Sequence, residues 1–241
     1  AGTDSGVAYV YDGRTSSLLY TLAGSTPFGE MGFAVAGRAD MDFDGRPEAL
    51  AAEPFAPVTP SQAGRVVAAR FDLPGHMDVA GYATGPSPEA FAIVDADGDG
   101  DLDVVVACSG DSTLRILWNG THATGGPQFA PGNFGLLPAT VVALDASSPP
   151  LCVAAANLDA DPGAEFVVGR ADGRIQRVDG TGTVAAPSFA AIPGLIVADQ
   201  HSPAGPVKDL AILGSGPSAR IAVALGGSPF VPGEVRLVSS I

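Results

Sequence analysis

The chain has 241 residues, with 26 acidic and 12 basic side chains that give a formal net charge of −14. Apolar residues make up 46% of it and charged residues only 16%, so a hydrophobic core is expected and extended disorder is not. Lys208 is the sole lysine, which excludes the basic patch that a nucleic acid or an anionic membrane surface requires. No apolar run of membrane-spanning length occurs. We therefore expect a single acidic, globular domain over residues 1–241, with no nucleic-acid partner and no membrane insertion.

Short strands are predicted along the whole chain. The first two form a hairpin, GVAYVYD (6–12) and SLLYTL (17–22). Later segments are β-branched or alternating and lie between Gly, Pro, Asp and Asn turns, and no stretch has the apolar periodicity of a long amphipathic helix. The clearest of them are GRVVAARF (64–71), STLRILW (112–118), GRIQRV (173–178) and ARIAVAL (219–225). The pattern predicts an all-β fold.

An internal repeat organises these strands. Residues 36–54, 92–110 and 154–170 align without gaps, and their acidic loops begin at Asp40, Asp95 and Asn157. Starts that lie about 55 to 62 residues apart suit one four-stranded β-propeller blade per repeat. A weaker fourth copy is expected from 195–200 to 208–216, where Asp199 and Asp209 are the remaining acidic residues, and we expect no metal there.

The three acidic loops are predicted to bind Ca²⁺. Carboxylates at loop positions 1, 3 and 5 converge when the chain turns sharply at position 6, and the carbonyl of position 7 and the carboxylate of position 9 complete an oxygen shell. Such hard oxygen ligands favour Ca²⁺ over metals that prefer sulfur or nitrogen. In the third loop Asn157 removes one charge and Pro162 replaces the glycine. The predicted ligands are Asp40, Asp42, Asp44, Arg46 and Glu48; Asp95, Asp97, Asp99, Asp101 and Asp103; and Asn157, Asp159, Asp161, Gly163 and Glu165.

The acidic loops have two other possible interpretations. An EF-hand needs a bidentate Glu at position 12, but Ala51, Val106 and Val168 stand there, each inside an apolar run. Simple acidic turns are the second alternative, because Asp, Asn and Gly favour turns. The clustering of carboxylates argues against simple turns, since unneutralised carboxylates in one loop repel each other. The three loops hold 12 of the 26 acidic residues and one of the 12 basic residues.

The chain resembles the FG-GAP repeats of integrin-α-type β-propellers and the related VCBS repeats of bacterial surface proteins. The resemblance begins at GVAYVYDGRTSSLLYTLAG (6–24) and GFAVAGRADMDFDGRPEALAAEP (32–54), and the second and third repeats look more like the VCBS variety. Gly32-Phe33 stands where the family has Phe-Gly, in reversed order. The resemblance implies a β-propeller of about four to five four-stranded blades, with Ca²⁺ loops between blade strands.

The number of predicted strands leaves open how the ring of the expected propeller closes. GEVRLVSSI (233–241) is the expected partner of the N-terminal hairpin. A fragment of a larger ring, or a ring completed by another subunit, fits the same count. Addition of a strand between subunits would then give a homo-oligomer or a fibre.

Several single residues have more than one possible structural role. Cys108 and Cys152 could form a disulfide or remain two buried thiols. Asn119-Gly-Thr is a glycosylation sequon, but Asn-Gly is also a common hairpin turn. Trp118 could be a sugar-stacking platform at a blade rim, although packing between blades is the stronger expectation. The three histidines have no metal-ligand spacing.

We expect a non-enzymatic, extracellular or cell-surface protein from which a signal peptide has been removed. Ca²⁺ would stabilise it as a structural or adhesive module that contacts a protein or glycan partner. A lectin-type propeller is the first alternative function, and a polysaccharide-active enzyme domain is the second. Scarce lysine and histidine count against the enzyme.

Overall fold

The structure, a computed structural model, describes residues 2–42, 44–59, 62–73, 76–119, 139–159, 161–183, 186–192, 196–197, 205–227 and 233–239. Its regular elements are β-strands, apart from the short 3₁₀ helix η2 (Gly216–Ser218). The predicted all-β class is confirmed. His122 and His201 lie outside the described residues, as does the sequon's Thr121.

The strands form five antiparallel sheets that follow one another along the chain. Within each sheet the strands pair with their neighbours in sequence, as in a meander, except that β15 (Ile196–Val197) pairs with β13 (Arg174–Thr183). The first sheet contains β1 (Val7–Tyr11) and β2 (Leu18–Ala23). The second contains β3 (Val35–Ala39), β4 (Glu48–Thr59), β5 (Gln62–Leu73) and β6 (His76–Ala83), and the third β7 (Pro88–Val94), β8 (Asp103–Cys108), β9 (Thr113–Leu117) and β10 (Thr140–Ala143). The fourth contains β11 (Pro150–Ala156), β12 (Glu165–Arg170), β13 (Arg174–Thr183), β14 (Ala186–Ala191) and β15 (Ile196–Val197), and the fifth β16 (Val207–Leu213), β17 (Arg220–Leu225) and β18 (Glu234–Ser239).

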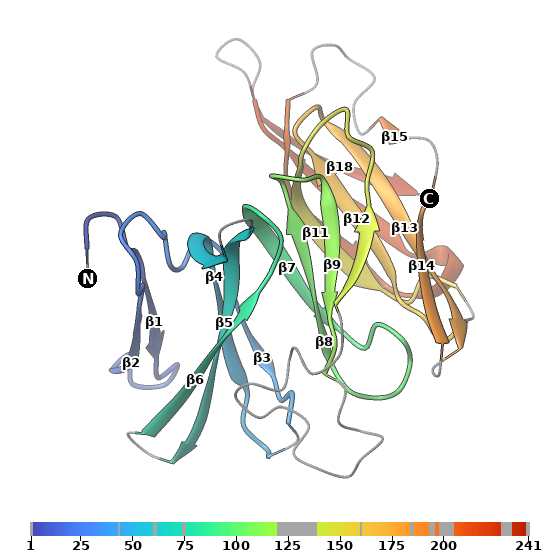
Figure 1. The fold of residues 1–241 in the computed structure, drawn as a ribbon. Coiled ribbons are helices and arrows are strands. Elements are labelled where there is room, and N and C mark those ends of the chain that lie inside the picture. Colours follow the sequence, from blue (N-terminus) through green and yellow to red (C-terminus); the bar gives the residue numbers. More distant parts are fainter. Residues whose placement is uncertain are drawn as a thin grey trace.

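The sheets are stacked in chain order, so that each sheet packs against the one that follows it. Figure 1 shows the N-terminal hairpin at one side of the molecule, with β3–β6 next to it. First strands of neighbouring sheets lie together: β3 beside β7, β7 beside β11, and β11 beside β16. Four hydrophobic clusters fill the four spaces between consecutive sheets. The core is therefore divided among the sheet-to-sheet contacts.

Strands inside the stack are apolar on both faces, because each face meets a different neighbour. In β8, Val104 and Val106 contact the second sheet, whereas Val105 contacts the fourth. In β12, Phe166 contacts the third sheet and Val167 the fifth. The period of two along each strand thus explains the continuous apolar runs that follow the acidic loops.

Trp118 and the two cysteines are core residues. Trp118 is 9% exposed, its ring centroid lies 5.9 Å from that of Phe189, and its Nε1–H donates to Thr140 Oγ1 at 3.2 Å. Packing between sheets, the stronger expectation for Trp118, is confirmed. Cys108 and Cys152 are buried free thiols in different clusters, and burial raises the pKa of each to about 12. The disulfide alternative is wrong.

Three expectations about the repeats need correction. The predicted N-terminal hairpin is confirmed as the two-stranded first sheet. Of the four sheets that follow it, two have four strands, whereas the fifth sheet has three and the fourth gains β15. β18 pairs with β17, and among the described residues it does not pair with the N-terminal hairpin. Asp209 lies inside β16, so the fifth sheet's counterpart of an acidic loop is the segment 214–219, which has no acidic residue.

Phe166→Ala should strongly destabilise the protein. Phe166 is fully buried between the third and fourth sheets and stacks on Phe189 with ring centroids 5.4 Å apart. We expect a loss of about 3–5 kcal/mol in the free energy of unfolding, measured by urea denaturation. The matched control Phe55→Ala removes a side chain that is 48% exposed, and should cost less than about 0.5 kcal/mol. Equal losses in the two variants would contradict the assigned core.

Candidate metal centre

The three predicted acidic loops occupy the same place in three consecutive sheets. Residues 40–48 connect β3 to β4, residues 95–103 connect β7 to β8, and residues 157–165 connect β11 to β12. Each loop therefore joins the first strand of a sheet to the buried second strand. We call them the first, second and third loops, and number their positions 1 to 9.

The carboxylate at position 9 closes each loop with the same hydrogen bond. It accepts the backbone N–H of position 2, seven residues earlier, and lies at the first residue of the buried second strand. This bond satisfies an amide that the sharp turn leaves without a strand partner. The three bonds are Met41 N–H to Glu48 Oε2 at 2.6 Å, Ala96 N–H to Asp103 Oδ2 at 3.0 Å, and Leu158 N–H to Glu165 Oε2 at 2.5 Å.

Positions 3 and 5 are fixed by further hydrogen bonds within each loop. The carboxylate at position 3 accepts the N–H of position 5, and the carboxylate at position 5 accepts the N–H of position 7. These six bonds measure 2.8–3.2 Å, and their acceptors are Asp42, Asp44, Asp97, Asp99, Asp159 and Asp161. The backbone amides therefore orient both side chains toward the interior of the loop.

A glycine at position 6 completes the first and second loops. Gly45 and Gly100 have φ of 86° and 97°, in the left-handed region that glycine adopts without strain. Their N–H groups donate to Oδ2 of Asp40 at 2.9 Å and of Asp95 at 3.1 Å, the aspartates at position 1.

The third loop lacks the hydrogen bond from position 6 to position 1, and its side chain at position 1 is a donor instead. Pro162 has no N–H to donate, and position 1 is Asn157, whose Nδ2 donates to the carbonyl oxygens of Asp161 at 2.6 Å and Gly163 at 3.2 Å. Two predicted ligands, Asn157 and the Gly163 carbonyl, are thus bonded to each other. The same role for the carbonyls of Arg46 and Asp101 stays a prediction.

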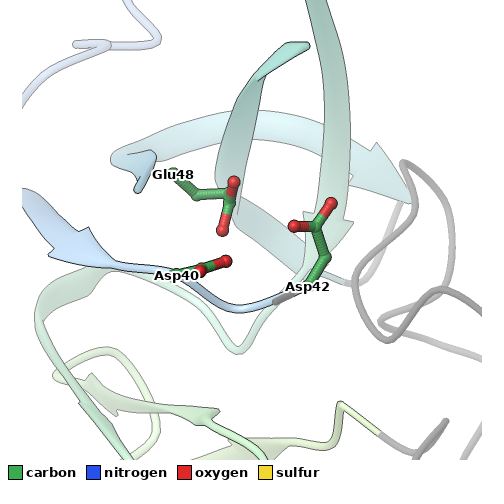
Figure 2. A group of neighbouring side chains, drawn as sticks. All are labelled: Asp40, Asp42 and Glu48. Carbon is green, nitrogen blue, oxygen red and sulfur yellow. The ribbon is translucent and has the colours of Figure 1, made fainter. Parts of the chain in front are cut away.

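The loops gather acidic side chains that could hold a metal ion. In each group one carboxylate oxygen from each residue lies within 4.8 Å of the others. Figure 2 shows the first group, with the carboxylates of Asp40, Asp42 and Glu48 directed toward one another. The other two groups are Asp95, Asp97 and Asp99, and Asp159, Asp161 and Glu165.

Two predicted carboxylate ligands, Asp44 and Asp103, lie outside these groups. Asp103 accepts backbone N–H groups with both oxygens, from Ala96 and from Asn119. Its side chain is one methylene shorter than that of Glu48, whose second oxygen remains with the acidic group. Asp44 uses Oδ1 for the N–H of Arg46, and its Oδ2 lies 3.7 Å from Arg70.

Buried oxygens without a hydrogen-bond donor show that these residues fit a cation. Asp40 Oδ1, Glu48 Oε1 and Glu165 Oε1 are buried and receive no hydrogen bond from the described residues. Glu48 and Glu165 are at most 1% exposed. Leaving a buried charged oxygen unsatisfied is costly, and a dication bound by several carboxylates removes that cost.

Burial raises the pKa of carboxyl groups in all three loops. The pKa of Glu48 rises to about 7, that of Asp97 to about 6 and that of Asp103 to about 8, in each case chiefly through burial and further through neighbouring carboxylates. Burial also raises the pKa values of Asp42 and Glu165. Without a cation, the fold therefore favours protonation of these groups.

Two arginines that the sequence analysis did not single out flank the loops. Arg70 Nε, on β5, lies 2.7 Å from Asp42 Oδ2, and Arg177 Nη2, on β13, lies 3.5 Å from Asp159 Oδ2. Among the described residues, no basic side chain forms an ion pair with the acidic group of the second loop.

Hydrogen bonds connect each loop to the next one. Ala164 N–H of the third loop donates to Ala96 O of the second at 3.0 Å, and Gly216 N–H of the fifth sheet donates to Asn157 O of the third, also at 3.0 Å. Asn119, which follows β9, joins the first two loops. Its N–H donates to Asp103 at 2.9 Å and its Nδ2 to Met41 O at 2.8 Å. The loops form one continuous row across the sheets.

This role is incompatible with glycosylation of Asn119 in the folded protein. The side chain is 2% exposed, and its Nδ2, the atom to which a glycan would be attached, is turned to Met41. Of the two interpretations of Asn119-Gly-Thr, the structure supports the one without a glycan. The contact spans 78 residues of sequence, which is why no local pattern indicates it.

Comparison with known proteins adds no relative. A scan against protein-family models gives no match, and a search of curated proteins gives no significant one. The resemblance to FG-GAP and VCBS repeats therefore rests on the loop residues and stays a prediction. In the part of the chain that the structure describes, no helix is long and apolar enough to cross a membrane.

Metal-depleted protein should become more stable as the pH falls from about 8 to about 5. The folded pKa values of Glu48 (about 7) and Asp103 (about 8) exceed their ordinary values of 4.5 and 3.8, so the folded state binds protons more tightly than the unfolded state. The resulting stability is complete below the unfolded pKa and is lost as pH rises through the folded pKa. Thermal unfolding midpoints across this range measure it.

Glu48→Gln is the matched control for this pH dependence. Gln retains an oxygen for the N–H of Met41 but cannot ionise, so the variant should show a flatter pH profile. A profile as steep as that of the unsubstituted protein, or a stability that increases toward pH 8, would contradict the assigned burial of Glu48.

Proposed function

We propose that this protein is a Ca²⁺-stabilised β-propeller-type scaffold, related to FG-GAP and VCBS repeats, that serves as a structural or adhesive module outside the cell. The observation that carries the proposal is the repeated loop: three loops share the hydrogen bonds accepted by positions 3, 5 and 9, and hold converging carboxylates at the same place in three consecutive sheets. Calcium is the preferred ion because the donors are carboxylate oxygens. Millimolar calcium outside the cell would keep even weak sites filled.

A structural role for the ions follows from the position of the loops. Position 9 lies at the start of a strand buried between two neighbouring sheets, and each loop is hydrogen-bonded to the next. An ion there would fix the start of the buried strand and the spacing between sheets together. A catalytic ion needs open coordination positions beside acid or base groups. Here the carboxylates are already bonded to the backbone of their own loops, which supports a non-enzymatic role.

Calcium should raise the thermal unfolding midpoint of the metal-depleted protein. Each site contributes about 2.7 kcal/mol when free calcium is ~100 times its dissociation constant. Asp97→Asn should reduce the shift, because it removes one charge from the second loop's acidic group. The matched control Asp209→Asn alters an aspartate on β16, outside the loops, and should leave the shift unchanged. No calcium-dependent shift in the unsubstituted protein would refute the proposal.

Glycan binding is the second candidate function, and a pocket between the first and second sheets favours it. The pocket has a volume of about 530 Å³ and adjoins the first loop. Its lining residues include the aromatic Tyr11, Tyr20 and Phe71 and the charged Asp12, Arg46 and Glu48. Aromatic faces and hydrogen-bonding charged groups together suit a sugar. Trp118, which is buried, is no longer a candidate platform.

Tyr11→Ala should abolish glycan binding if this pocket is a lectin site. Tyr11 is 57% exposed, so its removal should leave the fold intact. Binding on a glycan array, with calcium present, measures the effect. Tyr9→Ala, which alters an exposed neighbour that does not line the pocket, is the control. Absence of any bound glycan for the unsubstituted protein would remove this candidate and leave the scaffold role.

A further inference from the structure

The first and fifth sheets each expose an apolar face, whereas each of the three sheets between them packs against a neighbouring sheet on both sides. Each internal sheet contributes to two of the four hydrophobic clusters, one on either side. The end sheets contribute to one cluster each. An apolar sheet face that meets water is a common mark of a protein–protein interaction site.

The outer face of the fifth sheet is apolar with small residues at its centre. Ala222 pairs with Leu237 and Ala224 with Val235, while Ala211 pairs with Ala222 from the other side. Val235 is 73% exposed and Leu237 is 60% exposed. The residues that alternate with the alanines along β17 face the opposite way and fill the cluster against the fourth sheet. The two faces of the fifth sheet are therefore distinct. The result is a shallow alanine surface with larger apolar side chains beside it.

The outer face of the first sheet carries large residues. Val7 and Tyr9 alternate with the buried Ala8 along β1, and Tyr11, which follows a register shift and pairs with Leu18, stands at the edge of this face, where it also lines the pocket between the first and second sheets. Tyr9 and Tyr11 are 53% and 57% exposed, and their ring centroids lie 6.2 Å apart. Neither β1 nor β2 contains a charged residue.

We propose that these two faces bind each other between copies of the chain, so that the fifth sheet of one molecule packs against the first sheet of the next. The contact continues an interaction that the fold already makes four times, in which each sheet presents one face to the sheet that follows it. Size complementarity supports a second copy as the occupant, because tyrosines project from one face and alanines line the other. The charged residues that share the fifth sheet's outer face, Asp209 and Arg220, have opposite signs.

This contact is head-to-tail, since the two faces differ. Head-to-tail association extends until it closes into a ring or continues as a filament. It relies on side chains of the sheet faces. Pairing of β18 with β1 edge to edge would instead rely on backbone groups and would tolerate changes to these side chains. The proposed contact involves only the first and fifth sheets, so it does not depend on calcium binding by the loops.

Sedimentation of two complementary variants tests the proposal. Leu237→Lys blocks the fifth-sheet face, and Tyr9→Lys blocks the first-sheet face; both side chains are largely exposed, so both variants should fold. The unsubstituted chain should show a mass that increases with concentration. Each variant alone should remain monomeric, but an equimolar mixture should form a complex of about twice the monomer mass and nothing larger, because only one competent pair of faces remains.

Val141→Lys is the matched control, because it places the same charge on a 50%-exposed residue of the third sheet and should assemble like the unsubstituted chain. Four results would overturn the proposal. The unsubstituted chain could remain monomeric at its highest soluble concentration. Both blocked variants could assemble normally, which would indicate edge pairing or another surface. The mixture could fail to form the dimer, or Val141→Lys could abolish assembly and reveal non-specific adhesion.

Discussion

The hydrogen bond from the second position of each acidic loop to the carboxylate at the ninth is the interaction on which the rest of the structure depends. It places an acidic group at the first residue of a strand that is buried between two sheets, as Glu165 is at the start of β12. The bond satisfies one oxygen of a glutamate and leaves the other without a donor among the described residues. The fold therefore creates a buried negative charge that only a proton or a cation can compensate.

This constraint connects the chemistry of the loops to the stacking of the sheets. Val104 and Val105 follow Asp103 directly and enter two different hydrophobic clusters. An ion bound in the loop would therefore also fix the start of β8, whose residues enter both clusters. The row of hydrogen bonds that runs through Asn119 and Ala164 extends the effect from one sheet to the next. Metal binding and sheet packing are expected to be cooperative for this reason.

The sequence indicated most of the local features and few of the long-range ones. The all-β class, the strands and the three loops could be predicted because alternating carboxylates, a turn glycine and an apolar run are all encoded within about twenty residues. Arg70 could not be assigned to Asp42, because their contact depends on the register between neighbouring strands. Asn119 has its role through a partner 78 residues away. Asp209 was misplaced because the fifth sheet has no acidic loop to mark its register.

Hydrogen–deuterium exchange of the metal-depleted protein, with and without added calcium, tests the central claim most directly. We expect calcium to slow hydrogen–deuterium exchange within the three loops. We also expect slower exchange at the amides that connect the loops, those of Asn119, Ala164 and Gly216. We further expect slower exchange in β8 and β12, the buried strands that follow the second and third loops. Slower exchange confined to the loops, or no change on adding calcium, would contradict the claim that bound ions hold consecutive sheets together.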